Sequence, residues 1–312
     1  MTLQKSLQQA RNEITFIDRK THQKCVEKVY GEAALKLLYG DDLIAKIIGI
    51  PLLHLLVKNP IFSRVYGFFQ KCRWSRKKIK PFIKNFDIDP SEFLLPVDQF
   101  KSFNDFFIRK LKPQARPIEQ DKNAAIIPAD GRYLFYQNIA ETDGFIVKGQ
   151  KFNLETLLED PSLAKKYAKG SMIIARLCPT DYHRFHFPAD CVPSNAKMIN
   201  GWLYSVNPIA IKKDIHIFTQ NKRSITELDS ELFGKILFLE IGATSVGSIH
   251  QTYTPFQSQM KGDEKGYFSF GASCLILLFE EGSLILDEDL LLATNKGYEM
   301  RCLMGQKLGS KN

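Results

Sequence analysis

The sequence predicts an α+β protein in which a β-rich domain follows an amphipathic helical region. From Ala124 onward, short runs rich in β-branched and aromatic residues are separated by Gly, Pro, Asp and Asn, a pattern typical of strands joined by turns. Before that point, longer apolar stretches are mixed with Lys and Arg and broken by Pro51 and Pro60, which favours amphipathic helices. We therefore divide the 312 residues into an N-terminal region, 1–86, and a β-rich domain, 87–312.

The β-rich domain is predicted from nine short apolar runs: AAIIP, GRYLFYQNI, GFIVKG, SMIIARLC, KILFLEIG, SVGSIHQTY, YFSFG, SCLILLFE and SLILD. Helices do not alternate with these runs, so the pattern favours a compact β domain over parallel βαβ units. Residues 154–169 form the one clear helical insertion, a shorter helical piece is expected over residues 100–111, and the proline-punctuated residues 87–96 join the two regions.

Cysteine usage and hydropathy narrow the class of protein. The six cysteines are scattered without a CxxC pair, and the N-terminus lacks the apolar segment of a secretion signal, so we expect reduced cysteines inside a cell. The longest apolar stretch, residues 47–57, is broken by Pro51 and His54 and is too short to span a bilayer. We expect no integral membrane segment.

Positive charge is concentrated in the N-terminal region. Residues 43–85 contain no Asp or Glu and ten cations, namely Lys46, Lys58, Arg64, Lys71, Arg73, Arg76, Lys77, Lys78, Lys80 and Lys84. Nucleic acid and anionic lipid both attract such a segment. The apolar runs IIGIPLLHLLV and IFSRVYGFF and the nearby Trp74 favour a helix at a lipid headgroup layer and argue against a nucleic-acid partner. The alternative is a solvated basic face that packs on the β-rich domain.

A cluster of polar residues lies in the aromatic run LCPTDYHRFHFPADCVP, where His183 and His186 stand three residues apart. Together with Tyr182 and Arg184, these side chains are costly to bury for packing alone. The flanking cysteines suggest zinc, but their spacing matches no usual structural zinc site, and we predict no metal. Asp130, in the turn PADG, is by itself typical of a turn residue.

Ser273 lies where small residues interrupt the strand-like run GYFSFGASCLILLFE. The pattern alone fits a bulge or tight bend in a sheet. It also fits a serine nucleophile, which would need a histidine and a carboxylate from elsewhere, and His186 and Asp130 are available. The turn EIGATSVGSI lacks the lysine and the spacing of nucleotide-binding loops.

Three of these segments, PTDYHRFHFP, EIGATSVGSI and KGDEKGYFSFGAS, together resemble phosphatidylserine decarboxylases. The resemblance extends over nearly the whole chain, through FIDRKTHQK and EKVYGEAALKLLYG, which resemble one bacterial branch, and FNDFFIRKLKPQARPI, PADG and VKGQKFNLETLL.

The resemblance implies a lyase made as a zymogen that cuts its own chain between Ala272 and Ser273. The family's attacking serine falls on Ser273, its base on His186 and the orienting carboxylate on Asp130, while His183 is implied in decarboxylation. Ser273 would become a pyruvoyl cofactor that forms a Schiff base with phosphatidylserine, and phosphatidylethanolamine would be released.

The resemblance further implies that the long and short chains stay associated, and it allows a homodimer. The expected location is peripheral, on the cytoplasmic face of a bacterial-type cell membrane. Where the family usually has Gly before the serine and Thr after it, this chain has Ala272 and Cys274. A required positive φ at Ala272 would cost about 1–2 kcal/mol, which bears on the rate of maturation.

Three alternatives remain open at the level of sequence. The first is an unprocessed relative that binds membranes without chemistry. The second is a pyruvoyl-dependent decarboxylase of another amino-containing substrate. The third is hydrolysis of an external ester by an uncleaved Ser273.

Overall fold

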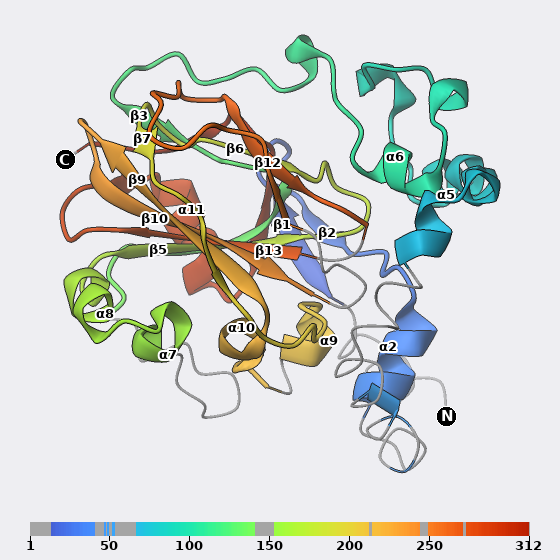
Figure 1. Ribbon diagram of the computed structural model, residues 1–312, viewed down its shortest axis with the longest axis horizontal. Helices are drawn as coiled ribbons and strands as arrows, with labels where there is room; N and C mark the ends of the chain where they lie inside the picture. The colour runs from blue at the N-terminus through green and yellow to red at the C-terminus, as the bar shows by residue number, and fades with distance from the viewer. Residues whose placement is uncertain are drawn as a thin grey trace.

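The computed structural model of the chain is shown in Figure 1. It describes residues 14–40, 47, 49, 52–53, 67–140, 153–211, 214–243, 249–270 and 273–311. The expected strand in GFIVKG, much of the turn EIGATSVGSI, and Ala272 lie outside the described residues, as does most of the apolar stretch at 47–57.

A large twisted sheet dominates the described chain. Its strands are β2 (Lys24–Val26), β1 (Thr15–Asp18), β15 (Glu299–Cys302), β4 (Gly131–Tyr136), β5 (Ser171–Leu177), β13 (Ser273–Phe279), β10 (Gly234–Gly242), β9 (Arg223–Ser230) and β7 (Val192–Pro193), in that spatial order, with β8 (Lys197–Ile199) also paired to β9. All neighbours are antiparallel except β1 and β15, which run parallel. The antiparallel pairing confirms the predicted β-rich domain without βαβ units.

Two small sheets and several short helices cover the large sheet. One small sheet contains β11 (Ile249–Gln251), β12 (Glu264–Phe268) and β6 (Arg184–His186), and the other contains β14 (Ile285–Leu286), β16 (Lys307–Ser310) and β3 (Ala124–Ile126). The α-helices are α2 (Glu32–Tyr39), α5 (Ile79–Asn85), α6 (Phe103–Phe107), α7 (Leu154–Leu158), α8 (Pro161–Tyr167), α9 (Pro208–Ile211), α10 (Ile217–Gln220) and α11 (Glu288–Asn295). The 3₁₀ helices are η2 (Arg73–Lys78), η3 (Pro90–Glu92), η4 (Val97–Gln99) and η5 (Pro113–Ala115).

The central strands are buried on both faces, so their residues divide between two cores. In β5, Met172 and Ile174 pack in the core under α7, α8 and α10, whereas Ile173 and Leu177 pack in the core that includes residues of α11 and β6. Figure 1 shows α7, α8, α9 and α10 side by side along one side of the large sheet. A third, phenylalanine-rich core lies around α5 and α6.

The helical insertion predicted at residues 154–169 is confirmed as α7 and α8. Asp160 separates them because its carboxylate accepts hydrogen bonds from the backbone N–H groups of Ser162 and Leu163, and Pro161 occupies the first turn. The helical piece expected over residues 100–111 is α6, which begins after Ser102; the Ser102 hydroxyl accepts from the Asp105 N–H at 3.1 Å.

The N-terminal region differs from its predicted helical character at residues 15–26, which form β1 and β2. In β1, alternate residues are buried, and the strand adds to the edge of the large sheet beside β15. Residues 15–26 therefore pack as part of the β-rich domain, although they lie within the region assigned to 1–86.

A buried ion pair joins the small sheet of β12 to the large sheet. The Lys265 ammonium donates to the Glu240 carboxylate and to Thr226 Oγ1 at 3.0 Å, and both charged side chains are fully buried. Burial lowers the pKa of Lys265, while Glu240 opposes this shift. A buried charge that loses its partner is strongly destabilising.

We predict that Lys265→Met lowers the free energy of unfolding by about 3–5 kcal/mol, because it leaves Glu240 unpaired in the core. The double variant Lys265→Met/Glu240→Leu should recover most of this loss. Lys235→Met is the matched control, since its pair with Glu227 is partly exposed and should change stability by less than about 1 kcal/mol. Denaturant unfolding measures all three; a double variant no more stable than Lys265→Met would contradict the interpretation.

Candidate active site

Ser273 begins the central strand β13 and is completely buried. It is paired with Leu177 of β5 on one side and Gly242 of β10 on the other. Because side chains alternate along a strand, Ser273 points to the same face as Leu275 and Leu277, and Cys274 points to the opposite face. The serine and the cysteine of this segment therefore face different cores.

The imidazole of His183 lies next to the Ser273 hydroxyl. His183 Nδ1 is 3.5 Å from Ser273 Oγ, a long contact, and His183 Nε2 is 2.8 Å from the carbonyl oxygen of Cys178. A carbonyl can only accept, so Nε2 carries the proton and the Nδ1 lone pair faces the hydroxyl. Contacts between a nucleophile and its base are often loose before reaction, and this tautomer suits His183 to accept the serine proton.

The surroundings of His183 keep its ring neutral. Phe107 of α6 stacks on the imidazole with ring centroids 3.8 Å apart and an interplanar angle of 24°. Burial lowers the pKa of His183 to about 3; the charge of Asp181 acts against this shift, and that of Arg109 adds to it. At neutral pH the ring is therefore a free base.

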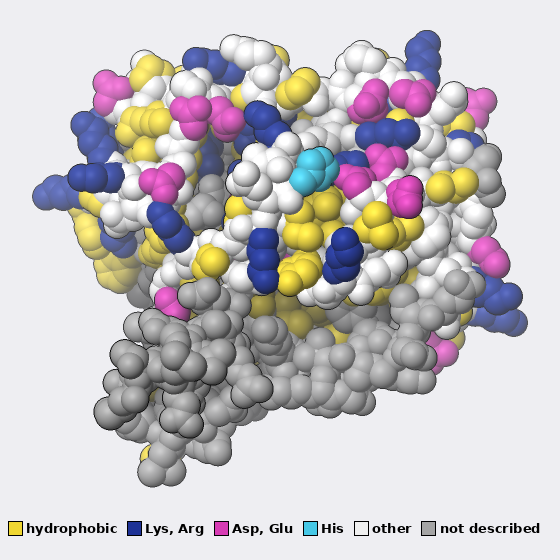
Figure 2. Space-filling model, turned by 180° about the vertical axis from the view of Figure 1, so that it is seen from behind, with side chains coloured by type: hydrophobic (Ala, Val, Ile, Leu, Met, Phe, Trp, Pro, Cys, Tyr) yellow, Lys and Arg dark blue, Asp and Glu magenta, His cyan; other side chains and the backbone are white. Residues whose placement is uncertain are grey.

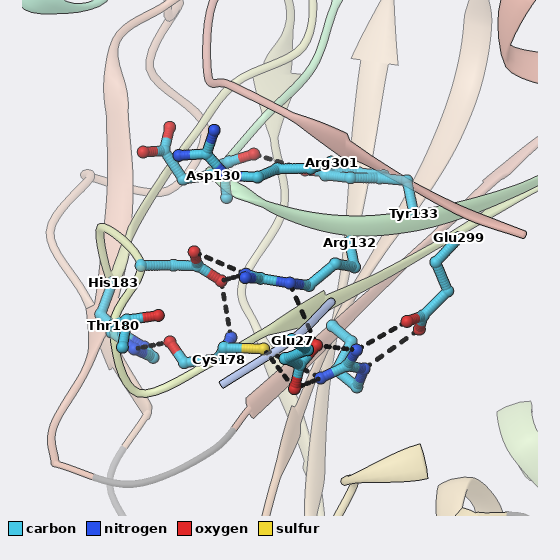
Figure 3. Close-up of polar contacts among 12 residues, drawn as sticks. Glu27, Asp130, Arg132, Tyr133, Cys178, Thr180, His183, Glu299 and Arg301 are labelled. Carbon is cyan, nitrogen blue, oxygen red and sulfur yellow. Dashed lines mark hydrogen bonds and ion pairs between the residues drawn. The ribbon is translucent and has the colours of Figure 1, made fainter. Parts of the chain in front are cut away.

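The turn before His183 is held by two arginines. Asp181 accepts hydrogen bonds from Arg132 and, at 2.7 Å, from the Cys178 N–H. Arg109 donates to the carbonyl oxygens of Thr180 and Asp181 at 3.1 and 3.2 Å. These bonds fix the Cys178 carbonyl that orients the imidazole (Figure 3).

Glu27 joins the N-terminal region to this turn. Its carboxylate pairs with Arg176 at 2.7 Å and with Arg132 at 3.2 Å, and Arg176 also pairs with Glu299 (Figure 3). Burial by itself would raise the pKa of Glu27, but the two arginines lower it. Burial raises the pKa of the nearby Cys178 thiol, more than the arginines lower it, so the thiol stays protonated.

Asp130 and His186 have other partners in the described chain. Asp130 accepts from Arg116 at 2.6 Å and from the Met304 N–H at 2.9 Å. His186 Nδ1 lies 2.9 Å from the Gly262 carbonyl oxygen, and Nε2 lies 3.3 Å from the Tyr182 hydroxyl. Burial lowers the pKa of His186, and the charge of Asp130 acts against the shift.

The structure thus brings Ser273 together with His183. Among the described residues, neither Ser273 nor Asp130 is hydrogen-bonded to His186. The sequence-based assignment of His186 as the base that acts on Ser273 stays a prediction.

Two residues of α6 contact the site and were not singled out from the sequence. Asn104 Oδ1 accepts a hydrogen bond from the Phe270 N–H at 3.0 Å, just before the segment that leads to Ser273. Phe107, three residues later on the same side of α6, stacks on His183. The sequence could have pointed to Asn104, because it is a polar residue within the aromatic run FNDFF and a buried amide needs a hydrogen-bond partner.

Among the described residues, no group of three or more His, Cys, Asp and Glu side chains is placed to hold a metal ion. The arrangement is a buried serine at a strand start with a neutral imidazole beside it. This arrangement places the chain among proteins in which a serine can act as a nucleophile on a nearby carbonyl.

Comparison with known proteins identifies the family. The family model of phosphatidylserine decarboxylase matches residues 103–310. The chain is 50% identical over 294 residues to the phosphatidylserine decarboxylase proenzyme of Chlamydia pneumoniae, covering 94% of this chain and 96% of that protein. The proenzyme of Clostridium botulinum is 46% identical over 298 residues, 96% of this chain and 99% of its own. The chain belongs to the phosphatidylserine decarboxylase family.

The stacking of Phe107 on His183 allows a test of the site that does not require enzyme activity. We predict that Phe107→Ala raises the pKa of His183 from about 3 toward its ordinary value of 6.5, because water reaches the ring. The measurement is an NMR pH titration of the imidazole in a Ser273→Ala background.

Phe100→Ala is the control, because Phe100 is buried in the same phenylalanine-rich core but packs on Phe93 and Phe106. It should leave the His183 titration unchanged. An equal shift in both variants would mean that general loosening of the core, and not the stacked ring, sets the pKa.

Proposed function

We propose that this chain decarboxylates phosphatidylserine to phosphatidylethanolamine and carbon dioxide after converting its own Ser273 into a pyruvoyl group. The contact between Ser273 Oγ and the neutral His183 imidazole is the observation that carries this proposal. Relatives that match nearly the whole chain are named phosphatidylserine decarboxylase proenzymes, and a proenzyme requires a maturation step.

Maturation would begin with proton transfer from Ser273 Oγ to His183 Nδ1. The oxygen then attacks the carbonyl carbon of Ala272, and an ester replaces the amide bond between residues 272 and 273. Elimination removes the α-proton of residue 273 and releases the Ala272 carboxylate. The dehydroalanine left at 273 reacts with water, loses ammonia and becomes pyruvoyl.

The surroundings of residue 273 fit this conversion. Burial raises the pKa of the Cys274 thiol, and its side chain faces the opposite core, so it does not compete with Ser273 as a nucleophile. The pyruvoyl group would supply a carbonyl that reacts with the substrate amine and accepts the electrons released with carbon dioxide. His183 lies beside residue 273 and can hold or return a proton there, and Phe107 keeps water from the imidazole.

The two fragments should stay together after cleavage. The short chain, 273–312, would contain β13, whose neighbours β5 and β10 belong to the long chain, and β15, which pairs with β1 and β4. Separating the chains would break these ladders and expose the central core. The homodimer allowed by the resemblance stays a prediction.

We also propose that the basic N-terminal region binds anionic membranes from the cytoplasmic side. No helix among the described residues is long and apolar enough to cross a membrane. Phe68, Phe69 and Trp74 are exposed beside the cations of residues 71–84, as expected of an interfacial segment. Residues 1–86 are thus proposed as the membrane-facing region, apart from β1 and β2, which belong to the large sheet.

Ser273→Ala should leave a single uncut chain, because the attacking oxygen is removed. Wild-type protein should show a fragment of residues 273–312 that begins with a pyruvoyl group. Intact-mass measurement and a denaturing gel distinguish these states. Wild-type protein that stays uncut would favour an unprocessed relative, and cleavage at this bond in Ser273→Ala would refute the chemistry.

The two histidines can be separated by their variants. His183→Ala should slow self-cleavage by about 10²–10⁴-fold, because the base beside Ser273 is lost. His186→Ala should cleave faster than His183→Ala, since His186 contacts Tyr182 and Gly262. A time course of cleavage by mass spectrometry measures both; the opposite order would support the sequence-based assignment of His186.

Binding to phosphatidylserine vesicles should weaken as salt is added, because each cation near an anionic surface contributes about 1 kcal/mol. Replacing Lys77, Lys78 and Lys80 with Glu should raise the apparent KM on vesicles and leave self-cleavage intact. Vesicle co-sedimentation measures binding, a decarboxylation assay on the same vesicles gives the apparent KM, and mass spectrometry follows self-cleavage. Loss of self-cleavage in this variant would show instead that the basic segment supports the core fold.

A further inference from the structure

In a groove on the outer side of η2, cationic side chains outnumber carboxylates. The groove has a volume of about 390 Å³, and four cations line it: Arg73, Arg76, Lys77 and Lys80. The one carboxylate in the lining belongs to Asp98, so three positive charges are in excess. Ile79 and Val97 contribute apolar surface to the lining.

Most of these cations are unpaired within the described chain. Arg76 donates to the backbone carbonyl oxygen of Asp98, while no hydrogen bond or ion pair to a described residue involves the side chains of Arg73, Lys77 or Lys80. The spacing of positions 73, 76, 77 and 80 places the four side chains on one side of η2 and the first turn of α5. Cations held together without counter-charges favour an anionic ligand.

The backbone under the groove is fixed. The buried Ser75 hydroxyl donates to the carbonyl oxygens of Gln70 and Cys72 and accepts from the Phe103 N–H of α6 at 2.9 Å. Ile79 is also buried against the phenylalanine-rich core. The cations therefore project from a braced turn, which lowers the entropy lost when they bind a ligand.

Exposed apolar side chains surround this charge. Phe68, Phe69 and Trp74 are 65%, 46% and 56% exposed, and the Phe69 ring contacts the other two rings edge to face. Leu94 and Leu95, also exposed, precede Val97 in the chain. Figure 2 shows Lys and Arg side chains beside exposed hydrophobic side chains along the edge that carries α5 and α6 in Figure 1. Apolar side chains around a phosphate-binding centre suit the surface of a bilayer.

We propose that this groove is a binding site for the phosphodiester headgroup of an anionic phospholipid that lies in the membrane, separate from the substrate at Ser273. Arg73 and Arg76 would bind the phosphate oxygens, Lys77 and Lys80 would add charge, and the aromatic rings would enter the acyl boundary. A volume of about 390 Å³ lies in the range of small-molecule sites and accommodates a headgroup. The site differs from general attraction between basic residues and a membrane because it depends on four particular cations.

The inference deepens the membrane binding proposed above and does not depend on decarboxylation. Binding is therefore measured with full-length Ser273→Ala protein, which lacks the proposed attacking oxygen, on phosphatidylcholine vesicles with and without phosphatidylglycerol. Phosphatidylglycerol supplies an anionic phosphodiester and is not the proposed substrate. Failure of the decarboxylase proposal would leave this measurement unaffected.

A matched pair of variants separates a site from diffuse charge. Arg73→Gln/Lys80→Gln and Lys71→Gln/Lys84→Gln each remove two exposed cations from neighbouring turns, but only the first pair lines the groove. We expect the groove pair to weaken binding to phosphatidylglycerol vesicles by about thirtyfold, from about 1 kcal/mol per cation, and the control pair to weaken it several-fold less. Equal losses would overturn the site.

The groove can also be tested through its aromatic side and its ligand. Trp74→Ala should weaken vesicle binding while Arg73 and Arg76 keep their charges, and circular dichroism checks that the variants are folded. Inorganic phosphate and a short single-stranded oligonucleotide are offered to the same protein in solution. If either binds the groove as tightly as the vesicles do, with the same loss in Arg73→Gln/Lys80→Gln, the membrane lipid is the wrong ligand.

Discussion

Ser273 starts a strand that is paired on both sides, and it lies opposite Leu177 of β5 and Gly242 of β10. This position has three consequences. The serine is buried, so its hydroxyl meets an imidazole instead of water. Alternation along the strand turns Cys274 to the other core. Together with β15, this strand also ties residues 273–311 into ladders with the preceding chain.

The histidine beside Ser273 depends on a buried set of charges. Arg132 and Arg176 lie opposite each other on β4 and β5, and Glu27, Asp181 and Glu299 surround them. Removing one partner would leave an unpaired charge in the interior, which costs more than the pair contributes. The set therefore fixes the turn at Cys178, and through the Cys178 carbonyl it fixes which nitrogen of His183 carries the proton.

Much of the fold could be predicted because alternating apolar residues and turn residues mark most strands of the β-rich domain. β1 and β2 were missed because each is short and gains its stability from pairing with β15 or β1, which local sequence does not show. Ser273 could be placed at the site from small residues within a strand-like run together with the family resemblance. Sequence did not distinguish the surroundings of His183 and His186, since both lie in one aromatic run. Their difference arises because His183 precedes β6 and His186 ends it.

Helix α6 links the outer surface of the protein to the surroundings of Ser273. At its start, the Phe103 N–H donates to Ser75 under the cationic groove; at its end, Phe107 stacks on His183, and between them Asn104 holds the backbone at Phe270. A helix of five residues in a phenylalanine-rich core has little freedom to bend. In the proposed membrane-bound state, a shift of η2 would therefore move the ring that covers the imidazole. The same packing that keeps His183 neutral places η2, the segment proposed to face the membrane, within one short helix of Ser273.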